Sequence, residues 1–121
     1  MNTALWVLQG LLGAVFVSAG LIKTFVPKSK LVAKLTWAED YSDVQVKLIG
    51  LVELLGGIGL VVPWYTGILP ILTPIAAAAL VPVMVGAAVV HVRRKEPPYP
   101  AVVLGVLSLA LALGRFGVFG Y

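Results

Sequence analysis

The chain has 121 residues, of which 60% are hydrophobic and 12% charged, and its formal net charge at pH 7 is +4. With a mean hydropathy of +1.05, this composition excludes an ordinary soluble domain and predicts one small membrane domain. The chain has no cysteine and one histidine, which excludes disulfides and thiolate metal sites, so we expect no metal centre.

Four apolar runs predict an all-α membrane protein, a bundle of four transmembrane helices that forms a single domain over residues 1–121. The predicted spans are residues 4–23, 46–63, 68–92 and 101–119, with an amphipathic cytoplasmic loop over residues 24–45. A run of about 19 residues gives a helix of ~28 Å, which is close to the thickness of the hydrocarbon core.

The first run could be a signal peptide, but it has no Lys or Arg before it and is longer than the apolar part of such a peptide, so we favour a retained membrane helix. Its polar side chains and two of its glycines share one stripe at helical spacing: Gln9, Gly13, Phe16, Gly20 and Lys23. This stripe is expected to face protein rather than lipid.

The polar segment from Lys23 to Lys47, which includes this loop, contains five lysines. Pro27 blocks continuation of the first helix, and a short amphipathic turn is expected to begin at Lys28 or Ser29. An interfacial loop that lies on the bilayer is favoured over a catalytic or recognition loop.

The second run, from Leu48 to Pro63, is apolar or glycine throughout except for Glu53. A carboxylate at this depth is costly unless it faces the bundle interior and finds a partner. Helical spacing places Gly50, Gly57 and Leu60 on the same side as Glu53, so another helix can approach that side closely.

The third run contains three prolines. Pro70 fits a first-turn position, whereas Pro74 and Pro82 are expected to bend the helix. A stiff segment at residues 96–100 then separates it from the fourth run. On the fourth helix, small residues and one cation share a face: Gly105, Ser108, Ala112 and Arg115.

Loop charges predict the orientation. The first and third loops are basic and the second carries no charge, so the basic loops are expected in the cytoplasm and both termini on the outer, periplasmic side. Aromatic side chains such as Trp6, Trp64 and Tyr41 fall where the two membrane interfaces would lie.

Depth along the helices predicts which polar groups meet. Lys23, Glu53 and His91 fall near the cytoplasmic face, whereas Arg115 falls at the level of Gln9, near the outer face. Glu53 is either an ion-pair partner of Lys23 or a proton carrier or ligand anchor, and His91 is an interfacial residue or a proton relay. Instead of facing the bundle interior, the side chains of Lys23 and Arg115 could each snorkel to lipid headgroups. The stripes together predict one interior, ligand-binding cleft, lined by Gln9, Phe16, Lys23, Glu53, His91 and Arg115.

Several stretches together resemble the DoxX-like family of small bacterial membrane proteins along nearly the whole chain. They are residues 19–23 (AGLIK), 37–41 (WAEDY), 48–56 (LIGLVELLG), 67–70 (GILP), 84–91 (MVGAAVVH) and 114–116 (GRF). The resemblance implies four transmembrane helices in a bacterial inner membrane. Some relatives are membrane subunits of a thiosulfate:quinone oxidoreductase, and others are linked to redox complexes or chaperone-like roles. The absence of cysteine argues against transferring the sulfur chemistry to this chain.

Two functional hypotheses follow, and neither includes nucleic acid as a partner. The first is a protein without a self-contained catalytic set that binds a small amphipathic ligand, a quinone or a lipid, or a partner protein through the polar cleft. The second is a membrane subunit of a redox or quinone-linked complex, in which Glu53 and His91 carry protons. A small transporter is less favoured, since four spans leave little room for alternating access. The small-residue stripes are compatible with a homodimer or a larger membrane complex.

Overall fold

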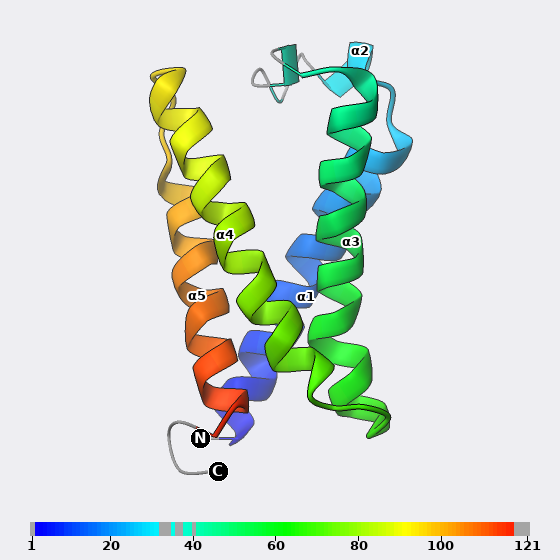
Figure 1. The fold of residues 1–121 in the computed structure, drawn as a ribbon, viewed down its shortest axis with the longest axis vertical. Coiled ribbons are helices and arrows are strands. Elements are labelled where there is room, and N and C mark those ends of the chain that lie inside the picture. The colour runs from blue at the N-terminus through cyan, green and yellow to red at the C-terminus, as the bar shows by residue number, and fades with distance from the viewer. Residues whose placement is uncertain (1, 32–34, 36–37, 40, 118–121) are drawn as a thin grey trace.

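The computed structural model describes residues 2–31, 35, 38–39 and 41–117, and every regular element among them is a helix (Figure 1). The helices are α1 (Asn2–Phe25), α2 (Lys28–Leu31), α3 (Asp43–Thr66), α4 (Leu72–Arg93) and α5 (Tyr99–Arg115). By length and composition α1, α3 and α4 can each cross a membrane, whereas the apolar helix α5 is shorter, with 17 residues. The predicted all-α fold of membrane-protein type is confirmed.

The helices are arranged as two pairs. Helix α1 packs along α3, and α4 packs along α5, with further contact between α3 and α4 and less between α1 and α5. In Figure 1 the pairs lie together where α1 begins and α5 ends, and they diverge toward the end that carries α2 and the α4–α5 turn. The two basic loops therefore lie at one end of the bundle, as loop charge predicted.

The predicted small and polar stripes are the faces that the helices bury. On α1, Gln9 and Phe16 are fully buried, and on α3 the face that contains Gly50, Glu53 and Gly57 is buried. The predicted face of α5 is buried as well. Leucine, valine and isoleucine side chains occupy the exposed surface, as expected for contact with lipid.

Helix α3 is longer than the predicted span at both ends. Ser42 forms a capping box with Gln45: the Gln45 N–H donates to Ser42 Oγ at 3.1 Å, and the Ser42 N–H donates to Gln45 Oε1 at 2.9 Å.

At its C-terminal end α3 continues through Pro63 to Thr66. Pro63 has no N–H to give to the carbonyl of Gly59, and the Thr73 hydroxyl of α4 donates to that oxygen at 2.9 Å. A neighbouring helix thus satisfies the group that the proline frees.

Helix α4 begins at Leu72 rather than at residue 68. Gly67 and Leu69 have positive φ angles of 75° and 49°, and a residue before proline avoids helical geometry, so residues 67–71 form a turn that includes Pro70. Pro74 lies in the first turn of α4. Backbone N–H groups in the first turn have no intrahelical acceptor, so a proline there breaks no helical hydrogen bond.

Helix α5 is displaced toward the N-terminus relative to the predicted span. It begins at Tyr99 within the proline-rich segment, because a proline such as Pro100 is tolerated in the first turn. The helix ends at Arg115, and positions 118–119 of the predicted span lie outside the described residues.

The segment between α1 and α3 folds back onto the bundle. Leu31, Ala38 and Val46 are buried together, and Leu35 and Tyr41 pack against them. The predicted amphipathic turn corresponds to α2, and its apolar side faces α3 rather than only the membrane surface.

Candidate functional site

A buried ion pair joins α1 to α3. Lys23 Nζ lies 2.5 Å from Glu53 Oε1, and the two side chains are 14% and 4% exposed. Lys23 comes from the last turn of α1 and Glu53 from the middle of α3. The ion pair is one of the two alternatives that the sequence left open for Glu53, and Lys23 does not snorkel to the surface.

Two glycines bring the backbones of α1 and α3 into contact beside the ion pair. A Cβ on Gly20 would lie 2.6 Å from the Gly50 carbonyl oxygen, and a Cβ on Gly50 would lie 2.6 Å from Lys23 Cβ. Atoms cannot approach that closely, so only glycine fits at either position. The two glycines therefore set the helix separation that lets Lys23 reach Glu53.

The ion pair forms part of the wall of a cavity of about 370 Å³ between the two helix pairs. Glu53, Lys23, His91 and Tyr41 supply its polar side chains. The remaining walls are apolar and come mostly from α4: Ile49, Pro82, Val83, Met84, Gly86, Ala87 and Val90. The cavity thus combines a few charged groups with an otherwise apolar lining, as small-molecule sites do.

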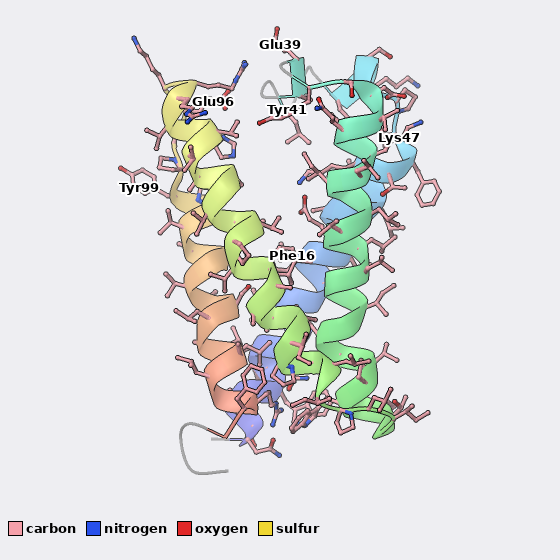
Figure 2. All side chains as sticks on the ribbon, viewed as in Figure 1. Phe16, Glu39, Tyr41, Lys47, Glu96 and Tyr99 are labelled. Atoms are coloured by element: carbon pink, nitrogen blue, oxygen red, sulfur yellow. The ribbon has the colours of Figure 1, made fainter. Side chains whose placement is uncertain are left out.

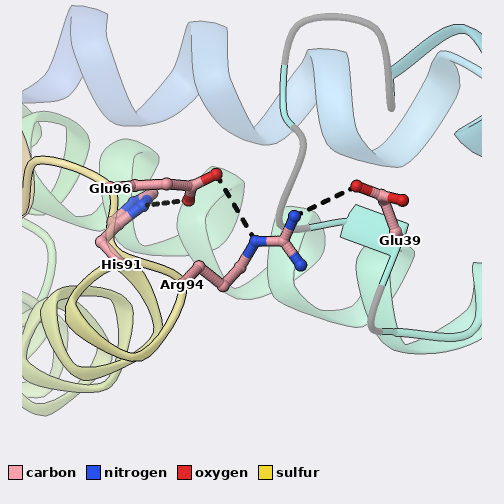
Figure 3. A network of polar contacts seen from close by, with 4 residues as sticks. All are labelled: Glu39, His91, Arg94 and Glu96. Atoms are coloured by element: carbon pink, nitrogen blue, oxygen red, sulfur yellow. Dashed lines mark hydrogen bonds and ion pairs between the residues drawn. The ribbon is translucent and has the colours of Figure 1, made fainter.

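A network of charged side chains lies beside His91 at the end of α4 (Figure 3). His91 Nδ1 lies 3.1 Å from Glu96 Oε1, and Arg94 Nε donates to Glu96 Oε2 at 3.4 Å. Arg94 Nη2 also donates to Glu39 Oε1 at 3.1 Å. Because Glu39 belongs to the segment before α3, the network connects the α1–α3 half of the molecule to the end of α4.

Arg115 occupies a second polar site at the opposite end of the bundle. Its Nε donates to Gln9 Oε1 at 2.6 Å and its Nη1 to Asn2 Oδ1 at 2.7 Å. Gln9 Nε2 in turn donates to the carbonyl oxygen of Leu60 at 2.8 Å. The chain of hydrogen bonds connects α5, α1 and α3, and Arg115 is 7% exposed. The guanidinium therefore points inward instead of snorkelling.

Two tryptophans also lie beside the guanidinium group of Arg115. Its Cζ lies 4.5 Å from the ring centroid of Trp64 and 5.5 Å from that of Trp6. Such cation–π contacts contribute more where water is excluded. Trp6 also meets Tyr65 edge-on, with ring centroids 6.4 Å apart.

The prediction of one continuous cleft is wrong. Lys23, Glu53 and His91 line the cavity, whereas Gln9 and Arg115 belong to the other polar site. Phe16 lies midway along the bundle (Figure 2) and is fully buried in the main apolar core. This core fills the space between the two polar sites with close-packed side chains: Leu12, Phe16, Leu60, Leu80 and Leu111.

The sequence pattern does not predict several residues around these sites. It indicates an interfacial position for Tyr41, whereas the structure shows that Tyr41 lines the cavity. It indicates no site role for Glu39, Arg94 or Glu96. The capping signal at Ser42 could have placed the start of α3, and hence Tyr41, near the bundle. No sequence signal connects Glu39 to Arg94, which are 55 positions apart.

A comparison with models of protein families gives a match. The family model described as the DoxX-like family matches residues 7–114, nearly the whole chain. Searches among curated proteins and among solved structures find no match. With four apolar helices, and with Lys23, Glu53, His91 and Gln9 all inside the matched range, the chain belongs to the DoxX-like family.

Proposed function

We propose that the protein binds the polar end of a small amphipathic molecule, a quinone or a lipid, in the cavity beside Glu53. The observation that carries this proposal is that the buried Lys23–Glu53 pair borders an otherwise apolar cavity of about 370 Å³. Besides contacting each other, both side chains line this cavity. Here Lys23 can donate to a carbonyl or phosphate oxygen of a ligand, and Glu53 can accept from a hydroxyl group.

Native mass spectrometry of the protein in mild detergent, with added ubiquinone or phospholipid, tests this proposal. Gly86 lines the cavity, and a Cβ there would have no atom within 4 Å, so Gly86→Leu fills the cavity without a steric clash at that Cβ. We expect Gly86→Leu to lose the bound molecule. Glu53→Gln should weaken binding about tenfold or more, since a hydrogen bond to a charged group contributes ~1.5–3 kcal/mol.

Gly10→Leu is the matched control, because a Cβ on Gly10 also has no atom within 4 Å and Gly10 does not line the cavity. Equal ligand occupancy in wild type, Gly86→Leu and Glu53→Gln would overturn the proposal. The same spectra report whether the chain is a monomer, a homodimer or part of a larger complex.

A redox or quinone-linked subunit is the second candidate function. It is favoured by one observation: Glu53 and His91 line the same cavity, and His91 continues into the Glu96–Arg94 network. In this function the two side chains carry protons while a partner supplies electrons to a bound quinone. Glu53→Gln and His91→Gln would then slow quinone reduction by the co-purified complex. Purified protein without quinone-dependent activity, with any co-purifying partner, would contradict it.

We further propose that α1, α3, α4 and α5 all span the bacterial inner membrane, with the basic loops in the cytoplasm and both termini in the periplasm. Because the chain has no cysteine, single cysteines can report this orientation. In intact spheroplasts, a membrane-impermeant thiol reagent should label Thr66→Cys. It should label Ser29→Cys only after permeabilisation, and both positions are exposed. The reverse labelling pattern would invert the topology.

A further inference from the structure

A second groove lies on the surface of the α4–α5 pair. Its volume is about 550 Å³. It is lined by α4 residues between Val81 and Arg93, by Pro98 just before α5, and by α5 residues between Val102 and Leu109. Among the residues that the structure describes, its lining is apolar apart from Arg93. The groove contains none of the four polar residues that line the cavity beside Glu53.

Arg93 and Arg94 are adjacent but have different surroundings. Arg94 binds Glu39 and Glu96. Arg93 is exposed and lies at the end of the groove, and among residues 2–31, 35, 38–39 and 41–117 no hydrogen bond or ion pair involves it. The groove therefore ends in a cation whose charge is available to an anionic partner.

The length of the groove identifies the kind of partner. From Val81 to Arg93 the groove follows α4 for ~18 Å at 1.5 Å per residue, whereas one leaflet contributes about half of a ~30 Å hydrocarbon core. The groove thus begins at the basic-loop end and stops near the middle of the membrane. A helix from a second copy of the chain would need an apolar surface along the whole span.

We propose that this groove is a binding site for an anionic phospholipid of the leaflet at the basic-loop end. One acyl chain lies between α4 and α5, and the phosphate is held by Arg93. Exposed valines form the sides of the groove, including Val85, Val102 and Val106. Gly105 also lines it and lets α5 approach α4 closely, since a Cβ there would lie 3.2 Å from Met84 Cβ.

Native mass spectrometry with phosphatidylglycerol and phosphatidylcholine, added in turn, tests the site. Wild-type protein should retain phosphatidylglycerol in preference to phosphatidylcholine. Arg93→Gln should weaken phosphatidylglycerol binding about fivefold, the factor that ~1 kcal/mol per basic residue gives, and should leave phosphatidylcholine binding unchanged. Val106→Trp, which fills the groove, should reduce binding of both lipids.

Two variants are matched controls. Lys95→Gln removes the same charge from the same end of α4, and Val103→Trp adds the same bulk at an exposed position of α5 outside the groove. Both should bind phosphatidylglycerol like the wild type. Both controls therefore separate a specific site from general effects of charge and bulk.

Equal losses of phosphatidylglycerol binding in Arg93→Gln and Lys95→Gln would show that only general surface charge acts, and would overturn the proposed lipid site. Loss of a dimer, rather than of lipid, in Val106→Trp would assign the groove to a second copy of the chain. Gly86, which lines only the cavity beside Glu53, is not part of the groove. In a Gly86→Leu background, Arg93→Gln should therefore still weaken phosphatidylglycerol binding, which separates this site from the cavity.

Discussion

Replacing Lys23 with methionine is expected to destabilise the protein by about 3–5 kcal/mol, the usual cost of breaking a buried ion pair by removing one partner. Glu53, whose side chain is 4% exposed, would then be buried without its partner cation. Unfolding by sodium dodecyl sulfate in detergent micelles, followed by circular dichroism, measures the change in the free energy of unfolding.

The chain offers a control and a rescue for this experiment. Lys47 pairs with Asp43 at 3.4 Å on the surface, with both side chains at least half exposed, so Lys47→Met should cost no more than about 0.5 kcal/mol. The double variant Lys23→Met/Glu53→Gln should recover most of the lost stability, because no unpaired charge remains. If Lys23→Met and Lys47→Met cost the same, the buried pair does not stabilise the bundle.

The second large effect is expected from Gly20→Ala. A Cβ at this position would overlap the backbone of Gly50 and Leu54, and backbone atoms cannot rotate away as a side chain can. The two helices must separate, at a cost of about 1–3 kcal/mol for overpacking. The same unfolding experiment should show this loss, together with weaker retention of the cavity ligand, since the separation also moves Lys23 from Glu53.

Gly10→Ala is the internal standard for this prediction. It adds the same methyl group to the same helix, where no atom lies within 4 Å, so only the higher helix propensity of alanine acts there. We expect Gly10→Ala to be neutral or slightly stabilising. A neutral Gly20→Ala would show that the α1–α3 contact is not as close as the glycines imply.

The buried faces of the helices could be predicted because helical spacing and the cost of burying charge point to the same residues. Gln9, Gly50 and Glu53 are all buried as predicted. The helix ends were predicted less well. Pro63 suggested a stop, but the Thr73 hydroxyl from α4 satisfies the Gly59 carbonyl and lets α3 continue. A contact with another helix cannot be read from local sequence.

Some of the contacts in the two polar sites could also be predicted, because they depend on the geometry of a single helix. The rise of 1.5 Å per residue fixes how deep each side chain lies along its helix, so the meeting of Lys23 with Glu53, and the shared level of Arg115 and Gln9, followed from counting residues. The lateral arrangement of the helices in the bundle could not be derived from counting residues. Phe16 faces the interior as predicted, but it packs into a core that closes the middle of the bundle.

The sequence by itself determined the membrane character, the four apolar helices, their buried faces and the depth of each polar group, because these depend on composition and on the geometry of a single helix. Only the tertiary structure decided that α1 pairs with α3 and α4 with α5 (Figure 1). It also decided that the polar groups divide into two sites and that a cavity remains beside Glu53. These features depend on how side chains from several helices fill a shared volume, and no single segment specifies that volume.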